Sequence, residues 1–333
     1  MERRVLLRVA GVSALTLATG AAGYAVGVKA SRDNTERAAA RTGASAPPSE
    51  PKALGGTPAV AAETARGRVF VMDSMLDVAN KTVTADDVVV GGSFCGASTV
   101  NRAMSKGVRA VIAHDAGVGR ERAGISGLAF GDRYGLPVAA VETMSAALSN
   151  GRTMADGVIG YANARAQELG VLPGQNAVEA ARLLLAAPPG RAVNGRVDLD
   201  EEVYEMEGTA AGGRVIAVST LVTLPKGGDY SRDVVALGNH AGSVIIPLLT
   251  QWRVRGWIAN DAGMGKFHSG VGGVSLCDPL RIPAAAVSTL SASIGSGRST
   301  YENGVVSAVN EMAQKQGVTV GMSARQALRL MAA

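Results

Sequence analysis

Short apolar runs alternate with longer mixed stretches along most of this chain, and the alternation predicts β-strands separated by helices. Between residues 66 and 187 the strands are expected in short runs rich in Val, Ile and Ala. These strands cover residues 68–72, 87–90, 109–113 and 137–141, and the predicted helices cover residues 97–106, 125–134, 155–169 and 175–186. Strands joined by helices favour a mostly parallel sheet that is covered by helices.

The same pattern occurs a second time. After a shift of 146 residues, roughly a third of the positions from 67 to 153 match without a gap, and Asp115-Ala116-Gly117 falls on Asp261-Ala262-Gly263. The two copies cover residues 66–187 and 212–333, and an acidic connector at residues 188–211 joins them. We therefore expect an α/β protein made by tandem internal duplication of a parallel-sheet unit, with the copies related by a pseudo-two-fold axis.

Composition and charge narrow the class of protein. Of the 333 residues, 47% are hydrophobic and 18% are charged, which favours a globular protein with a sizeable core over a disordered chain or a coiled coil. Two cysteines exclude a disulfide scaffold and a four-cysteine zinc module. The net charge is +5, but residues 1–66 carry nine Lys and Arg against five Asp and Glu, so the repeats are almost neutral. We therefore expect no nucleic-acid partner.

The N-terminus carries a separate signal. Residues 1–29 begin with basic residues and continue with an uncharged stretch from residue 9 to residue 28. The run Arg3-Arg4-Val5-Leu6-Leu7-Arg8 resembles the twin-arginine export signal. The resemblance implies an exported protein that is periplasmic or extracytoplasmic, with the segment either cleaved or kept as a membrane anchor. A buried, non-targeting helix is the alternative. Residues 30–65, rich in Ala, Pro, Ser and Thr, predict a flexible linker.

Polar side chains follow the predicted strands of both copies, where parallel sheets bind their ligands. All three histidines, His114, His240 and His268, lie in or beside these loops. They are either hydrogen-bonded loop residues or acid–base groups. Asp115 and Asp261 occupy equivalent positions directly after a strand. Such a carboxylate could accept N–H groups of its own loop or act as a general base.

A Gly-x-Gly sequence follows each of these aspartates, with Gly117 and Gly119 in the first copy and Gly263 and Gly265 in the second. Between a strand and a helix, the backbone N–H groups of such a loop could hold a carboxylate or an oxyanion. The spacing matches neither the dinucleotide-binding fingerprint nor the P-loop. We therefore expect no nucleotide cofactor.

Cys95 follows one predicted strand and precedes a predicted helix. This position resembles the strand–turn–helix elbow of α/β-hydrolases and glutaminases, and a helix N-terminus there is expected to lower the pKa of the thiol. The alternative is a small apolar side chain packed in a tight loop. Ala241 stands at the equivalent position, so the second copy lacks this thiol.

Together these features favour an exported or membrane-tethered hydrolase, ahead of an isomerase or lyase, with one site in loops between the two repeats. The expected substrate is a small metabolite, with carboxylated metabolites as one option. The candidate catalytic residues are Asp115, Asp261, His240, His114 and Cys95. The candidate substrate-binding residues are Ser93, Asn239, Gly117, Gly119, Gly263, Gly265, His268, Arg152 and Arg298; the two arginines could instead pair with acids such as Asp156 and Glu302.

No organic cofactor is expected, and a divalent metal held by histidines and aspartates is an open alternative. The membrane is expected as a partner only through the N-terminal segment, and a homo-oligomer is open. The alternative function is a non-catalytic binding or assembly protein of the cell envelope.

Overall fold

The computed structural model describes residues 3–4, 50–197 and 203–333, which form two compact units. The first unit contains residues 50–197 and 262–270, and the second contains residues 3–4, 203–261 and 271–333. A short segment of the second sequence repeat thus belongs to the first unit. The export signal predicted in residues 1–29, apart from Arg3 and Arg4, and residues 30–49 of the predicted linker lie outside the described residues.

A mixed six-stranded sheet forms the centre of the first unit, in the order β2-β3-β4-β5-β6-β7. The strands are β2 (Ala59–Thr64), β3 (Gly67–Met72), β4 (Val88–Phe94), β5 (Ala110–His114), β6 (Val138–Val141) and β7 (Ile159–Ala162). Strands β3 to β6 are parallel, and the edge strands β2 and β7 pair antiparallel to their neighbours.

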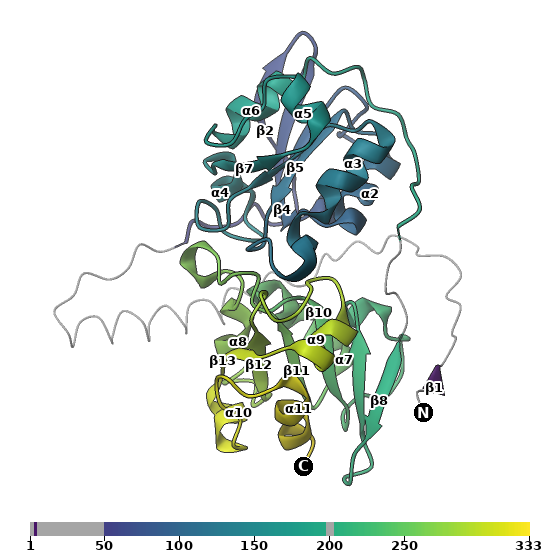
Figure 1. Cartoon of the computed structure of the whole chain (residues 1–333), viewed down its shortest axis with the longest axis vertical. Helices are drawn as coiled ribbons and strands as arrows, with labels where there is room; N and C mark the ends of the chain where they lie inside the picture. Colours follow the sequence, from purple (N-terminus) through teal and green to yellow (C-terminus); the bar gives the residue numbers. More distant parts are fainter. Residues whose placement is uncertain (1–2, 5–49, 198–202) are drawn as a thin grey trace, which may run out of the picture. The chain divides into compact units, whose positions relative to one another are not determined.

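Helices cover both faces of this sheet, as Figure 1 shows. One face packs against α4 (Gly151–Ala155), α5 (Ala164–Glu168) and α6 (Ala177–Leu184), and the other packs against η1 (Met75–Ala79), α2 (Ala97–Lys106) and α3 (Ser126–Tyr134). Successive strand residues alternate between the two faces, so that Val88 and Val90 lie in the first core layer and Val89 lies in the second. Because both faces are covered, the central parts of strands β3 to β6 are apolar.

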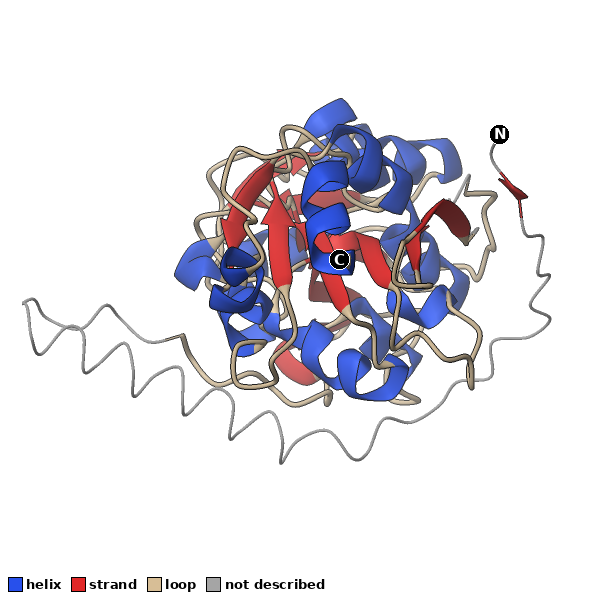
Figure 2. Ribbon diagram, turned by 90° about the horizontal axis from the view of Figure 1, so that it is seen from below, coloured by secondary structure: helices blue, strands red, loops and turns tan. Residues whose placement is uncertain are grey.

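The second unit repeats this architecture. Figure 2 shows the strands in red among helices in blue and loops in tan. Its sheet has the order β1-β8-β9-β10-β11-β12-β13, with β9 to β12 parallel. The strands are β1 (Arg3–Arg4), β8 (Tyr204–Gly208), β9 (Arg214–Val218), β10 (Val234–His240), β11 (Gly256–Asn260), β12 (Ala284–Val287) and β13 (Val306–Val309). The helices are η3 (Leu221–Thr223), η4 (Ser243–Ile245), α7 (Ile246–Trp252), η5 (Lys266–His268, in the first unit), α8 (Gly272–Leu276), α9 (Gly297–Asn303), α10 (Glu311–Lys315) and α11 (Ala324–Ala332). The predicted duplicated α/β fold is therefore confirmed, whereas the pseudo-two-fold axis stays a prediction.

Three predicted boundaries differ from the structure. Residues 59–64, assigned to the linker, form edge strand β2, and residues 204–208, assigned to the connector, form edge strand β8. The helix expected over residues 155–169 is wrong, because residues 159–162 form β7 and only residues 164–168 are helical in α5. Edge strands bury one side only, so their sequences lack the long apolar runs that mark the central strands.

Over the described ranges, no helix combines the length and the apolar character needed to cross a membrane.

Candidate functional site

The carboxyl ends of the parallel strands in the first unit meet three stretches of loop. Residues 115–124, which include all of η2 (Arg120–Ile125) except its last residue, follow β5, and residues 142–150 follow β6. The third stretch, residues 262–270, packs on the second: the Lys266 N–H donates to the Thr143 carbonyl (3.2 Å) and the Lys266 Nζ donates to the Ser145 carbonyl (3.1 Å). We call residues 115–124, 142–150 and 262–270 the carboxyl-edge cluster.

Asp115 is the buried carboxylate of this cluster, with only 3% of its surface exposed. Its Oδ1 accepts the Gly117 N–H (3.1 Å) and the Thr143 hydroxyl. Within the described residues, its Oδ2 accepts no hydrogen bond. A buried carboxylate usually has all its acceptor positions filled, so the second oxygen of Asp115 has room for a further donor.

The backbone after Asp115 is strained. Four successive residues have positive φ angles: Ala116 (50°), Gly117 (73°), Val118 (60°) and Gly119 (67°). Residues 262–265 repeat this, with φ angles of 49°, 71°, 66° and 71°. A left-handed conformation costs an L-residue about 1–2 kcal/mol, and a β-branched residue adopts it rarely. Strain of this kind persists only where surrounding contacts impose it, and it is common at functional sites.

Internal hydrogen bonds hold this strained loop. The N–H groups of residues 116–119 donate to His114 Nδ1, to the Asp115 carboxylate, and to the carbonyls of Asp115 and Gly117. These four groups already have acceptors inside the protein, and the expectation that Gly117 and Gly119 hold an anion stays a prediction. In the 262–265 loop, the Gly265 N–H is likewise used, by the Gly263 carbonyl.

His114 is fully buried and bridges two parts of the carboxyl-edge cluster. Its Nδ1 accepts the Ala116 N–H (3.0 Å), and its Nε2 lies 3.1 Å from the Ala146 carbonyl. Burial lowers the pKa of His114 and outweighs the Asp115 charge, which raises it. Asn260, at the equivalent position, makes a similar bridge from its Nδ2 to the Ala292 carbonyl (2.9 Å). These contacts favour the hydrogen-bonded loop residue among the two interpretations of His114.

The side chains of Cys95 and Ser93 both contact other residues of the first unit. Cys95 is fully buried, with its Sγ 4.0 Å from the Ala139 carbonyl. Burial, with a smaller effect of Asp115, raises the pKa of the Cys95 thiol. The expected lowering by the helix N-terminus is therefore wrong, and the environment is that of an apolar core residue. The Ser93 hydroxyl accepts the Met75 N–H (2.9 Å).

The candidate residues of the second unit lie at the carboxyl ends of its own strands. His240 is buried, and its Nδ1 accepts the Gly242 N–H (3.1 Å). Asp261 is also buried, and its Oδ1 accepts the Thr289 N–H (2.9 Å). Asn239 precedes His240, and its buried Oδ1 has no partner among the described residues.

The remaining candidates lie at or near the surface. His268 is exposed and belongs to the carboxyl-edge cluster of the first unit. Arg152 is exposed on α4. Arg298 pairs with Glu302 (3.1 Å), so the ion pair named as the alternative role of this arginine is confirmed.

The structure thus brings Asp115, His114, Gly117, Gly119, Gly263, Gly265 and His268 together in the first unit, and it places Asp261, His240, Asn239 and Arg298 in the second. The single site expected between the repeats stays a prediction.

Sequence reasoning missed two members of the carboxyl-edge cluster, Thr143 and Lys266. Thr143 orients the Asp115 carboxylate, and Lys266 brings a positive charge to residues 142–150. The repeat carries a signal for both, because Thr289 matches Thr143 and Arg120 is the basic residue that matches Lys266.

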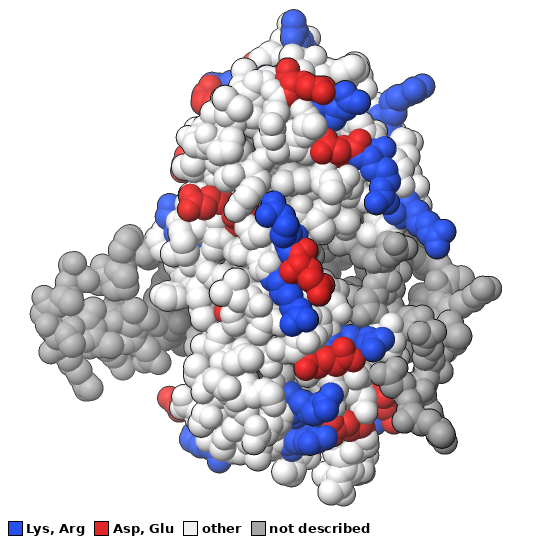
Figure 3. Space-filling model, in the orientation of Figure 1, with Lys and Arg blue, Asp and Glu red and all other residues white. Residues whose placement is uncertain are grey.

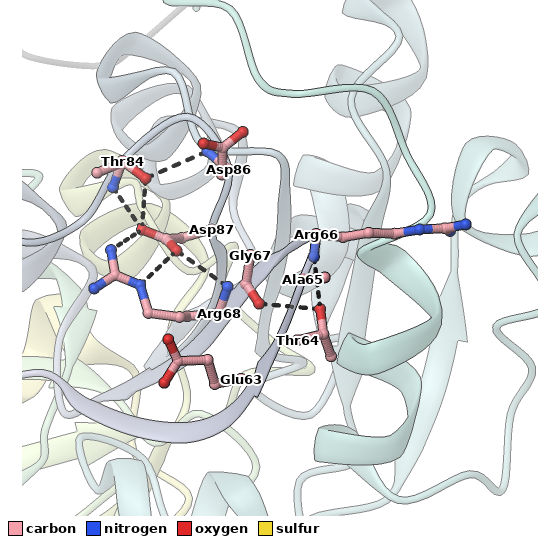
Figure 4. Close-up of a pocket in the computed structure, with 9 residues that line it drawn as sticks. All are labelled: Glu63, Thr64, Ala65, Arg66, Gly67, Arg68, Thr84, Asp86 and Asp87. Atoms are coloured by element: carbon pink, nitrogen blue, oxygen red, sulfur yellow. Dashed lines mark hydrogen bonds and ion pairs between the residues drawn. The ribbon is translucent and has the colours of Figure 1, made fainter.

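A cavity of about 360 Å³ lies at the opposite, amino-terminal edge of the first sheet (Figure 4). Its buried Asp87 accepts hydrogen bonds from Arg68 (Nη2–Oδ2 2.9 Å) and from Thr84. Burial by itself would raise the pKa of Asp87, but these hydrogen bonds outweigh it and hold the pKa below its usual value. Arg214 and Asp233 form the same ion pair in the second unit (2.6 Å). This ion pair, present in both units, links neighbouring strands. Since Arg68 and Asp87 are already paired with each other, the cavity offers few groups for binding or catalysis.

Neither charge nor metal ligands single out another site. On the face in Figure 3, Lys and Arg lie beside Asp and Glu, without a broad region of one sign. Among the residues that the structure describes, no three His, Cys, Asp or Glu side chains form a group that could hold a metal ion.

Compared with protein-family models, with curated proteins and with solved structures, the chain shows no match.

Proposed function

We propose that this chain is a hydrolase of small molecules and that Asp115 is its general base. The observation that carries the proposal is the Asp115 carboxylate, which is buried, oriented through Oδ1 and without a partner on Oδ2 among the described residues. A general base needs a fixed orientation and a free lone pair. The position after a parallel strand and the strained loop beside it also support a binding site here.

In the proposed reaction, Asp115 Oδ2 takes a proton from a water molecule, and the water oxygen attacks an acyl carbon of the substrate. The bond to the leaving group then breaks, and the proton passes from Asp115 to that group. Lys266 contributes the ammonium of the cluster, bonded to the Ser145 carbonyl. A positive charge there suits a substrate with a carboxylate, which is why a small carboxylated ester, lactone or amide is the first candidate.

The test uses the full chain and a panel of small carboxylated esters, lactones and amides. Asp115→Asn keeps an acceptor for the Gly117 N–H and the Thr143 hydroxyl but removes the base, so the protein should fold normally. We expect turnover to fall by about 10²–10⁴-fold. The control is Asp156→Asn, which removes an exposed carboxylate of the same unit and should leave turnover unchanged. Turnover by Asp115→Asn at the wild-type rate would contradict the proposal.

A second candidate is a non-catalytic binding protein, which a different observation favours. Large apolar side chains are exposed at equivalent positions of both copies: Leu76 (58%) with Val222 (56%), and Met144 (61%) with Leu290 (77%). All four follow the carboxyl ends of strands. Exposed apolar groups of this kind are common at binding surfaces. Absence of turnover across the panel, together with binding that Met144→Lys abolishes, would favour this candidate.

We also propose that residues 1–29 export or tether the chain. The support is the sequence Arg3-Arg4-Val5-Leu6-Leu7-Arg8 before an uncharged stretch. Replacement of Arg3 and Arg4 by lysine should keep the protein inside the cytoplasm, as cell fractionation would show. Export of that variant at the wild-type level would argue against a twin-arginine signal.

A further inference from the structure

His114 connects the strained loop to the rest of the first unit through both of its ring nitrogens. The Ala116 N–H can only donate, so His114 Nδ1 must be unprotonated, and Nε2 then carries the proton that is donated to the Ala146 carbonyl. One neutral tautomer satisfies both contacts. In the imidazolium form Nδ1–H would face the Ala116 N–H, and that hydrogen bond would be lost.

The hydrogen bond that protonation of His114 would break lies at the first residue of the strained loop. Ala116 is the first of the four residues with positive φ, and its N–H donates to the side chain of His114 at Nδ1. Because the left-handed conformation is unfavourable for Ala116 and Val118, the loop depends on its anchoring contacts. The other side-chain anchor is the Asp115 carboxylate with Thr143.

Few charged groups surround the imidazole. Asp115 is the charged residue that acts on it among the described residues, and burial acts in the opposite direction and more strongly. Directly after β4 the titratable neighbour is Cys95, whose N–H donates to the His114 carbonyl, and from β6 the neighbour is the apolar Val141. The other stretches of the cluster contribute the exposed Glu142, Lys266 on the Ser145 carbonyl, and the exposed His268.

We propose that His114 is a pH-sensitive switch of the 115–124 loop: the loop is closed while the imidazole is neutral and opens when the imidazole binds a proton. In the open loop the imidazole meets water and has its ordinary pKa near 6.5, whereas in the closed loop the pKa lies lower. Acidification below about pH 6.5 therefore favours the open loop, by up to about tenfold per pH unit until the lower pKa is passed.

The second copy provides the matched control. Asn260 donates from its Nδ2 to the equivalent Ala292 carbonyl and cannot titrate. His114→Asn therefore transfers the residue of the second copy into the first, keeps a donor and an acceptor, and removes the proton-binding group. The switch is read from the loop itself, so its test does not depend on the proposed hydrolase activity.

The experiment is backbone hydrogen exchange on the full chain at pH 7, 6 and 5, corrected for the intrinsic exchange rate at each pH. In the wild type, protection of the amides of residues 116–119 should fall below pH 6.5 by up to about tenfold per pH unit. In His114→Asn it should change by less than about twofold, and helix α6 should keep its protection in both proteins. Equal losses in the two proteins, or no loss in the wild type, would overturn the proposal.

A second measurement covers the case in which His114→Asn does not fold. The wild-type imidazole is titrated by NMR, with the Ala116 amide shift recorded in the same samples. The switch requires a His114 pKa below 6.5 and a change of the Ala116 amide at the same midpoint. A His114 titration without any change of the Ala116 amide would overturn the proposal.

Discussion

The close contact between the two glycine loops gives a sharp prediction about stability. Gly263 has a φ angle of 71°, and a Cβ on it would lie 2.9 Å from the Gly117 Cα and 3.3 Å from the Thr143 Cγ2. All three residues belong to the first unit. Gly263→Ala therefore combines an unfavourable backbone conformation with an overlap against backbone, which cannot be relieved by a side-chain rotation.

The chain offers a matched control for the backbone term. Gly135 ends α3 with a φ angle of 72°, and a Cβ on it would meet no atom within 4 Å. Gly135→Ala should therefore cost only the left-handed conformation, about 1–2 kcal/mol. Gly263→Ala should cost the same plus the overlap, which for overpacking is about 1–3 kcal/mol. The difference between the two variants isolates the contact between the loops.

The assay is urea unfolding of the wild type and both variants, followed by circular dichroism. Since both glycines lie in the first unit, the same transition reports both substitutions. We expect Gly263→Ala to lower the free energy of unfolding by about 1–3 kcal/mol more than Gly135→Ala does. Equal effects would refute the packing of residues 262–270 on the 115–119 loop.

Three further predictions concern groups that the structure gives internal roles. Asp87→Asn should reduce acid sensitivity: the lowered pKa of Asp87 gives stability that is present above the ordinary carboxyl pKa, about 3.9, and is lost as pH falls through the lower folded value. Urea unfolding between about pH 2 and pH 6 checks this, and an unchanged pH profile would contradict it. Cys95 and Cys277 should react with a thiol reagent only in urea, because burial raises both pKa values, that of Cys277 to about 12; fast labelling of the native protein would disprove this. Arg109→Met should cost about 1–3 kcal/mol, because its guanidinium caps carbonyls at the end of α6; urea unfolding measures this, and wild-type stability would show that the cap is not needed.

The central strands and the duplication could be predicted from the sequence because they produce strong local patterns. The central parts of strands β3 to β6 are apolar runs, since helices cover both faces of the sheet. The edge strands could not be predicted in the same way. Residues 59–64 read Ala-Val-Ala-Ala-Glu-Thr and bury only part of their surface, which resembles a linker in composition.

The position of the candidate site could also be predicted, but the state of its groups could not. The sequence places His114 and Asp115 at a strand end, yet their partners Ala146 and Thr143 are 32 and 28 residues away. Whether the imidazole Nε2 of His114 or a carboxylate oxygen of Asp115 is free depends on such distant contacts. For the same reason, burial of Cys95 by the surrounding core reversed the pKa shift expected from its helix.

The measurement that tests the central claim most directly is an NMR titration of the labelled full chain with small carboxylates and short carboxylated esters. If the carboxyl-edge cluster is the binding site, the amide signals of Gly117, Thr143 and Lys266 should shift together and saturate at one ligand concentration. Asp115→Asn should change that concentration while the Arg68 and Asp87 signals stay fixed. Saturable shifts confined to Arg68 and Asp87, or no saturable shift with any compound of the panel, would contradict the account.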